Sequence, residues 1–184
     1  MLYLNRARVS RYIALEPNVL MHEHIRENAN EAGYHESAGT LVILSCGAED
    51  TNYILSSLSR TATSPGQPPP LVDTVISVLT LCTIPAPQKT IFNLVRDVLK
   101  SGGQLLMYEH VLSKREDVAW WQRFWAPVWA VAFDGCRMDR PSDLWVKELK
   151  VDGFSAWRES RVWVKEGEDE ENLFFHSVGR FVKA

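Results

Sequence analysis

The chain has 184 residues, of which 46% are hydrophobic, enough for one domain with a substantial buried core. Its 23 acidic and 20 basic residues leave a formal net charge of -3, which excludes the basic footprint typical of proteins that bind nucleic acid or anionic membranes. Three widely separated cysteines (Cys46, Cys82 and Cys136) form neither a disulfide framework nor a zinc-ligand spacing. We therefore predict reduced thiols, no metal site and a cytoplasmic protein. No apolar run is long enough to span a bilayer, and residues 1–10 lack the apolar core of a signal peptide.

Short apolar strands and helical segments alternate in the first half of the chain. Residues 12–15 favour a strand that ends in the sequence ALEPN, and a helix from about Val19 to Gly33 follows it. Residues 40–45 (TLVILS) form a continuous apolar run, typical of a strand buried on both faces. The Pro-, Ser- and Gly-rich residues 56–70 are expected to form a flexible surface insertion.

The second half repeats this alternation and closes on a hairpin. The expected elements are a buried strand over 73–81, a helix from about Pro87 to Lys100, a strand over 104–111, a Trp-rich helix over 116–133, and two strands over 156–164 and 173–182. Apolar strands separated by helices predict an α/β fold with a Rossmann-like, mostly parallel sheet, to which the last two strands add an antiparallel hairpin. We expect one domain over residues 1–184.

Ligands of such sheets gather at the carboxyl ends of the strands, so the residues there are the first candidates for a site. Glu16 ends the first strand and can accept two hydrogen bonds from a ribose diol, with Pro17 and Asn18 beside the adenosine. An equally weighted alternative is a plain helix start, in which Asn18 caps the helix and Glu16 is merely solvated.

The second strand ends in GAED, which offers Glu49 or Asp50 to an adenine amine while Ala48 packs beside the ring. Taken alone, this loop is better interpreted as an ordinary acidic turn. Two acidic ends on neighbouring strands, however, describe an adenosine pocket better than either does separately.

Four stretches together resemble class I S-adenosylmethionine-dependent methyltransferases. ALEPN resembles the ribose-binding strand end, GAED the adenine-binding loop, DTVISVLTLCTI the fourth strand with its substrate-side loop, and VRDVLKSGGQLLMYEHV the helix, glycine turn and fifth strand. LTLC, YEHV, WWQRFWAPVWAVAFDGC and the closing hairpin narrow the resemblance to the methyltransferase-like seven group, small enzymes associated with methylation of alkyl thiols. The resemblance runs from Tyr12 to the end, apart from residues 56–70. It implies S-adenosylmethionine as methyl donor and a small-molecule acceptor, with a thiol as the expected class.

The resemblance also implies roles for individual residues. The cofactor side comprises Glu16, Pro17, Asn18, Ala48, Glu49, Asp50, Leu79, Thr80 and Leu81. The substrate side comprises Cys82, Glu109, His110, Asp134, Gly135 and Cys136. His110 is the candidate base for forming a thiolate, although a strand-end histidine bonded to backbone is the more ordinary interpretation. We interpret the two cysteines as buried, unreactive thiols, and the tryptophans of residues 120–129 as core or lid packing, one or two of them lining an apolar acceptor pocket.

One part of the family pattern has no counterpart here. The family begins with a central strand that ends in G-x-G-x-G, whereas residues 1–10 contain no glycine, so relative to the family the chain is expected to be N-terminally truncated. The strands at Tyr12 and Val72 must then pair directly, leave a gap, or borrow a strand from residues 1–4 or from another chain. Unpaired buried backbone groups cost about 1–3 kcal/mol each. A simple gap is therefore unexpected, and a homo-oligomer is one way to fill the position.

Two hypotheses of different class follow. In the first, the chain is a methyltransferase, either recorded from an internal start or with its cofactor site completed in another way. In the second, it is a catalytically inactive methyltransferase-like binding or interaction protein, or a truncated gene product without the cofactor glycine loop.

Overall fold

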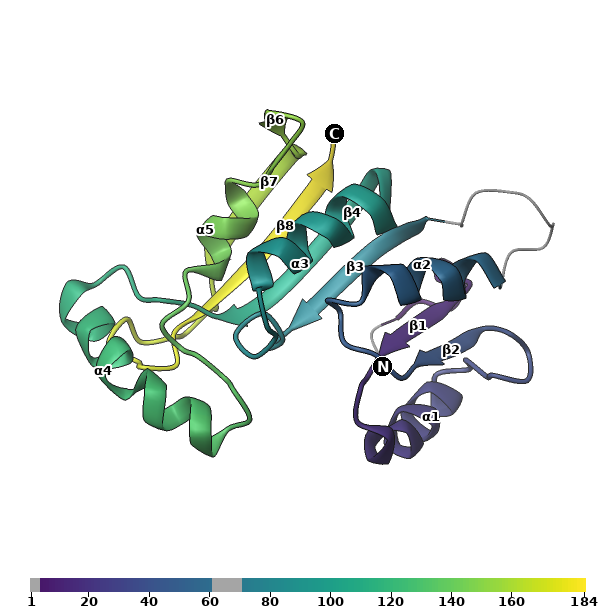
Figure 1. Ribbon diagram of the computed structural model, residues 1–184, viewed down its shortest axis with the longest axis horizontal. Coiled ribbons are helices and arrows are strands. Elements are labelled where there is room, and N and C mark those ends of the chain that lie inside the picture. The colour runs from purple at the N-terminus through teal and green to yellow at the C-terminus, as the bar shows by residue number, and fades with distance from the viewer. Residues whose placement is uncertain (1–3, 61–70) are drawn as a thin grey trace.

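The structure, a computed structural model, describes residues 4–60 and 71–184 (Figure 1). Its elements in chain order are β1 (Tyr12–Leu15), a 3-10 turn η1 (Val19–Met21), α1 (His22–Glu31), β2 (Leu41–Leu44), α2 (Thr51–Arg60), β3 (Val72–Val78), α3 (Pro87–Asn93), a π-helical segment η2 (Leu94–Val98), β4 (Leu99–His110), α4 (Glu116–Ala132), α5 (Ser142–Lys147), β5 (Lys150–Val151), β6 (Phe154–Ser155), β7 (Trp157–Val164) and β8 (His176–Lys183). None of the helices in these ranges combines the length and the apolar character needed to cross a membrane.

The strands form an α/β arrangement of the expected kind. β1 and β2 pair in parallel, and β3 and β4 pair in parallel. The closing hairpin of β7 and β8 is antiparallel and joins the second sheet beside β4, which gives the order β3-β4-β8-β7. A small antiparallel pair, β5 and β6, lies apart from these sheets. The predicted Rossmann-like fold with an antiparallel C-terminal hairpin is confirmed.

Between β1 and β3 the sheet is interrupted. In the described residues β1 pairs with β2 alone and β3 forms the edge of the larger sheet, so the two strands do not pair directly. That another copy of the chain fills the position stays a prediction. Residues 1–3, one proposed source of a filling strand, lie outside the described ranges. Apolar side chains join the two halves instead: Leu44, Ile54 and Leu58 share one core with Leu94 and Val98.

A second core fixes the strands that lead to the candidate site. Leu99, Val95 and Phe181 are completely buried there, and β4 runs through the middle of its sheet. Alternate residues of β4 from Leu105 onward are buried, because successive side chains of a strand point to opposite faces. This alternation buries Glu109 and leaves His110, the last residue of β4, partly accessible.

Two boundaries differ from the sequence expectations. Residues 56–60, expected in the flexible insertion, belong to α2, because Ile54 and Leu58 give this otherwise polar segment one buried face; residues 61–70 of that insertion lie outside the described part. The helix that starts at Pro87 stops at Val98, earlier than expected, and β4 begins at once. A Cβ on Gly103 would come within 2.9 Å of Asp73 O, so the glycine permits the close approach of β3 and β4 there. The short helix α5 was not anticipated.

Candidate functional site

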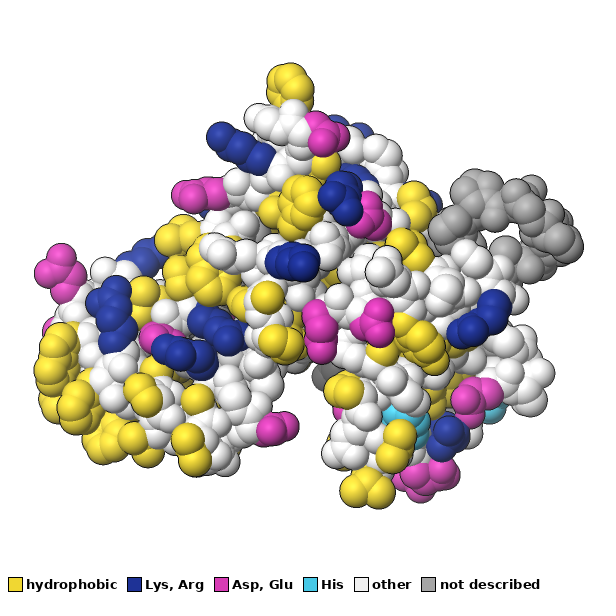
Figure 2. All heavy atoms as spheres, viewed as in Figure 1, with side chains coloured by type: hydrophobic (Ala, Val, Ile, Leu, Met, Phe, Trp, Pro, Cys, Tyr) yellow, Lys and Arg dark blue, Asp and Glu magenta, His cyan; other side chains and the backbone are white. Residues whose placement is uncertain are grey.

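Two strand ends of the separate sheets point to the same side of the molecule. Figure 1 shows the arrowheads of β1 and β3 directed toward the side on which α4 lies. Figure 2 shows the surface hollowed there, between α4 and the part that carries β1, β2 and α1. The carboxyl ends of parallel strands therefore open onto a concave region, as a ligand site requires.

At the end of β1, both interpretations of ALEPN are visible. Asn18 Oδ1 accepts a hydrogen bond from Leu20 N at 3.0 Å, so Asn18 does cap the turn η1. Glu16 is half-buried, and its Oε1 accepts a bond from Asn18 N at 2.8 Å, while Pro17 is exposed. His22 Nε2 lies 2.8 Å from the backbone oxygen of Glu16 and braces the turn. The carboxylate is thus held at the strand end, and its role toward a ribose stays a prediction.

The loop after β2 is mainly the start of a helix. Asp50 Oδ1 accepts a hydrogen bond from Tyr53 N at 3.1 Å, which caps the first turn of α2. Ala48 packs against the core that joins the two sheets. Glu49 is exposed, and its carboxylate folds back over Gly47, where a side chain would collide with it. Glu49 therefore stays the better candidate for contact with a ligand, whereas Asp50 is used by the helix.

The loop after β3 is shaped by one buried carboxylate. Glu109 has no exposed surface; its Oε1 accepts bonds from Ser77 Oγ (2.7 Å) and Thr80 N (3.0 Å), and its Oε2 from Leu81 N (3.0 Å). Burial raises the pKa of the Glu109 carboxyl above its ordinary value, although these hydrogen bonds oppose the shift. Leu79 enters the loop with φ 51°, a left-handed conformation that is strained for leucine. Glu109 was expected on the substrate side, but its contacts give it a positioning role for the predicted cofactor loop.

The remaining predicted substrate-side residues come together beside this loop. Asp134 and Gly135 have φ values of 49° and 84° and turn the chain sharply after α4. The turn is tied to the β3 loop by a bond from Arg137 N to Cys82 O at 2.9 Å, which places Cys136 Sγ 3.5 Å from Cys82 Sγ. Asp134 itself is exposed.

His110 completes this group. Its Nδ1 lies 3.8 Å from Cys136 Sγ, and its ring packs against those of His176 and Phe174. Burial, and secondarily His176, lowers the pKa of His110, which keeps the imidazole neutral at physiological pH. Burial raises the pKa of the Cys82 thiol to about 12. A neutral imidazole close to the protonated Cys82 thiol agrees with the prediction that Cys82 is unreactive and leaves His110 able to accept a proton.

Two anchoring residues were missed by sequence reasoning. Gln122 of α4 is completely buried; its Oε1 accepts from Ser113 N at 2.7 Å, and its Nε2 donates to Val111 O and Leu173 O. Arg140 donates from Nη1 to Leu81 O at 2.8 Å and to Ile84 O at 2.9 Å. Neither has a local signal in the sequence, because their partners are distant backbone groups.

An apolar cavity of about 380 Å³ lies between α4 and the segment before β8. Its lining residues are Trp125, Val128, Trp129, Ala132, Phe133, Met138, Leu173 and Phe174. The Phe174 ring packs on both Trp129 and His110, with ring centroids 4.6 Å and 5.9 Å apart, so Phe174 links the cavity to the histidine, which is not itself a lining residue. It has the character of a site for a small apolar group.

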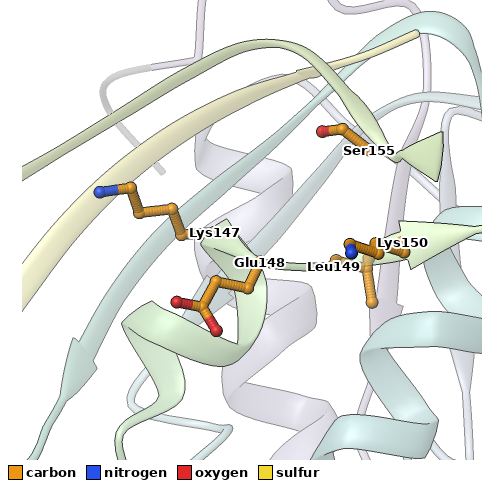
Figure 3. A pocket seen from close by; sticks show the side chains of 5 residues that line it. All are labelled: Lys147, Glu148, Leu149, Lys150 and Ser155. Atoms are coloured by element: carbon orange, nitrogen blue, oxygen red, sulfur yellow. The ribbon is translucent and has the colours of Figure 1, made fainter.

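A second cavity, of about 570 Å³, is lined by Lys147, Glu148, Leu149, Lys150 and Ser155 (Figure 3). It contains none of the predicted site residues. The charged ends of Lys147 and Glu148 point in different directions in Figure 3, so polar groups do not converge on a ligand position there.

Comparison with known proteins agrees with the fold and with the sequence resemblance. No model of a protein family matches the chain. Thiol S-methyltransferase TMT1B of Rattus norvegicus is 36% identical over 85 residues, which are 46% of this chain and 33% of the relative. The human thiol S-methyltransferase TMT1A is 33% identical over 75 residues, 39% of this chain and 29% of the relative. The match therefore spans about a third of these relatives' length.

The solved structures that resemble the chain are methyltransferases or share their fold at low sequence identity. YcgJ from Bacillus subtilis has a TM-score of 0.60 at 12% identity and covers 95% of this chain and 82% of its own. An O-methyltransferase family protein from Burkholderia thailandensis has a TM-score of 0.56 at 11% identity, over 95% and 44%. The N-methyltransferase NodS from Bradyrhizobium japonicum, solved with S-adenosyl-L-homocysteine, has a TM-score of 0.50 at 12% identity, over 94% and 66%. The chain thus has the fold of the class I S-adenosylmethionine-dependent methyltransferases and is related in sequence to the thiol S-methyltransferases.

Proposed function

We propose that this protein takes part in S-adenosylmethionine-dependent methyl transfer to a small-molecule acceptor, and that the acceptor is a thiol. The observation that carries the proposal is the grouping at the strand ends: Glu109 orders the loop after β3, His110 ends β4, and Phe174 both packs on His110 and lines an apolar cavity. The names of the sequence relatives support the thiol as acceptor class.

The adenosine half of the donor is matched by residues on the other side of the concave region. Glu16, half-buried at the end of β1, is suited to the ribose diol, and the exposed Glu49 to the adenine amine. Loop residues Leu79 to Leu81 would then lie toward the sulfonium end. The printed sequence has no G-x-G-x-G, so this loop is the segment that we assign to the methionine part.

The transfer itself asks for positioning more than for strong acids or bases. The acceptor sulfur must lie in line with the methyl carbon and the sulfonium sulfur, and a bound, aligned pair gains most of its rate from that geometry. A thiol must also lose its proton before it reacts efficiently, because the thiolate is the nucleophile. His110 is neutral and packs on Phe174, which lines the cavity, so it is our candidate for accepting that proton.

Methyl transfer can be tested directly. The full chain is incubated with methyl-labelled S-adenosylmethionine and a small alkyl thiol, and the labelled thioether and S-adenosylhomocysteine are quantified by mass spectrometry. We expect both products in equal amounts, with the corresponding alcohol unreactive. Glu16→Ala should lower the rate, and Glu31→Ala, which removes an exposed carboxylate from the end of α1, should not. Thioether at or below the no-protein control would refute the activity.

A second candidate is a methyltransferase-like binding protein without catalysis. The interruption between β1 and β3 in the described residues favours it, because a central position of the sheet is not filled there. Saturable binding of S-adenosylhomocysteine together with no thioether for a panel of thiols would select this candidate over the enzyme.

A further inference from the structure

Three soft metal ligands from separate parts of the chain meet at the strand ends. Cys82 lies in the loop after β3, His110 ends β4, and Cys136 lies in the turn after α4. Their Sγ and imidazole nitrogen atoms all lie within 4.8 Å of one another. Both sulfur-bearing residues are buried, with exposed fractions of 1% for Cys82 and 9% for Cys136. No metal site was predicted from the sequence because these cysteines are 54 residues apart in the chain. The fold brings their sulfur atoms to 3.5 Å from each other.

Two of the three ligand-to-ligand distances match those of a tetrahedral zinc site, and the third, between Cys82 and His110, is within 4.8 Å. With zinc–sulfur bonds of about 2.3 Å and zinc–nitrogen bonds of about 2.0–2.1 Å, tetrahedral geometry separates neighbouring ligand atoms by about 3.5–3.8 Å. Cys82 Sγ and Cys136 Sγ are 3.5 Å apart, and Cys136 Sγ and His110 Nδ1 are 3.8 Å apart. Sulfur and imidazole ligands with no carboxylate suit Zn²⁺ and disfavour Mg²⁺ or Ca²⁺, which prefer oxygen.

The surroundings hold all three ligands in place. Glu109 fixes the backbone of the loop that precedes Cys82. The bond from Arg137 N to Cys82 O ties the two cysteine-bearing segments together. The His110 ring packs against His176 and Phe174. Such outer contacts orient ligands before the metal arrives, as in known metal sites.

We propose that Cys82, His110 and Cys136 bind one Zn²⁺ ion through two thiolates and one imidazole, with the fourth position open to an exchangeable ligand. Three protein ligands with an open position are typical of catalytic rather than structural zinc. Binding would release the two cysteine protons, since thiolates are the ligating form. The zinc site itself does not depend on the proposed methyl transfer.

A role for the open position does rest on the proposed function. With zinc bound, His110 would be a ligand and could not accept the proton. An acceptor thiol that binds at the open position would instead lose its proton to solvent and stay on the metal as a thiolate. A sulfur electron pair then forms the bond to the methyl carbon, while the bond from that carbon to the sulfonium breaks and leaves its electron pair on S-adenosylhomocysteine. The neutral thioether is a weaker ligand than the thiolate and can leave. This role would give the acceptor class its chemical basis.

The test is metal content. The full-length chain, purified without a metal-binding tag and dialysed against zinc and then against metal-free buffer, should retain about one Zn²⁺ per chain by plasma mass spectrometry and by native mass spectrometry. Cys82→Ser and Cys136→Ser should each weaken zinc affinity at least tenfold. Cys46→Ser is the matched control, because Cys46 is also buried but belongs to the core that joins the two sheets. Substitution with Co²⁺ should produce sulfur-to-cobalt charge-transfer absorption in the wild type and in Cys46→Ser.

A wild-type chain that retains less than about a tenth of a zinc equivalent, or that binds Co²⁺ without charge-transfer absorption, would overturn the proposal. The same holds if Cys46→Ser loses as much zinc as Cys82→Ser does. These wild-type readings decide the matter even where a cysteine variant fails to fold. Calorimetry with S-adenosylhomocysteine on the same samples separates the two claims. Zinc retention without S-adenosylhomocysteine binding keeps the metal site and rejects the proposed function, whereas S-adenosylhomocysteine binding without zinc retention keeps the proposed function and rejects the metal site.

Discussion

At the scale of single residues, Glu109 shows how a predicted site residue can serve the site indirectly. Its side chain was expected to face a substrate, yet it is buried under the loop after β3 and accepts three hydrogen bonds there. A carboxylate can accept from both oxygens, whereas an amide has one accepting oxygen and a donating nitrogen. The backbone of Thr80 and Leu81 is therefore held only when both side-chain oxygens of Glu109 can accept hydrogen bonds.

Glu109→Gln tests this positioning role. The amide nitrogen would face a donor that it cannot accept from, and a buried donor left without a partner costs about 1–3 kcal/mol. We expect the free energy of unfolding, measured by urea denaturation, to fall by that amount. Glu148→Gln is the control, because Glu148 is exposed and such changes stay within about 0.5 kcal/mol. Equal stability of both variants would show that the hydrogen bonds of Glu109 do not hold the loop.

The predicted role of Glu16 is to bind the ribose of the cofactor, and this role can be tested by substitution. It is half-buried at the end of β1, with Oε1 engaged by Asn18 N. Hydrogen bonds from a ribose to a charged carboxylate contribute about 1.5–3 kcal/mol. Glu16→Ala should therefore weaken S-adenosylhomocysteine binding by roughly 10- to 150-fold in calorimetry. An unchanged dissociation constant would remove Glu16 from the cofactor site.

At the scale of elements, α4 departs most from what its composition indicates. Its tryptophans were expected to pack in the core or a lid, with one or two lining an apolar pocket. Trp125 and Trp129 do line the apolar cavity, whereas Trp120 and Trp121 are 55% and 47% exposed. The buried positions are instead Val118, Ala119, Gln122 and Ala126. Figure 2 shows hydrophobic side chains gathered on the surface over this helix. The helix is thus attached through Val118, two alanines and the Gln122 amide, together with the contact of Trp129 with Phe174, while Trp120 and Trp121 stay largely exposed.

Gln122 is therefore predicted to matter more for stability than an exposed polar residue of the same helix. Gln122→Leu would leave Ser113 N, Val111 O and Leu173 O without their partner, since water does not reach this site. We expect the free energy of unfolding to fall by about 2–4 kcal/mol. Arg123→Ala, one position along and exposed, should change it by less than about 0.5 kcal/mol. A thermal unfolding series that ranks the two variants equally would contradict this account of α4.

At the scale of the whole molecule, the sequence was most informative where burial follows local pattern. β1 was predicted over the same residues, and runs rich in Val and Ile also located β2 and β3. The expectation that β3 is a buried strand was wrong, because β3 forms a sheet edge and Ile76 and Val78 are 53% and 56% exposed. α2 was not predicted because half of its residues are Ser, Thr or Asn, and packing of Ile54 and Leu58 against the other half of the molecule stabilises it as a helix. The end of the helix at Val98 was not predicted, because the close pairing of β3 and β4 at Gly103 makes β4 begin before the expected end of the helix.

The candidate site divides in the same way. Glu16 and His110 could be placed at strand ends because a strand ends where its apolar run stops. The meeting of Cys82 with Cys136 could not, because it depends on how α4 returns the chain over the sheet. Whether the unfilled position between β1 and β3 is completed by a second copy of the chain stays a prediction, as do a single domain over the whole chain and a cytoplasmic location.

The central claim is that this fold presents a cofactor site, and calorimetric titration of the 184-residue chain with S-adenosylhomocysteine tests it most directly. We predict saturable binding of one ligand molecule per chain, because an acidic strand end and an ordered loop flank the same concave region of the surface. Absence of heat, and of any thermal stabilisation, at millimolar ligand would contradict the claim.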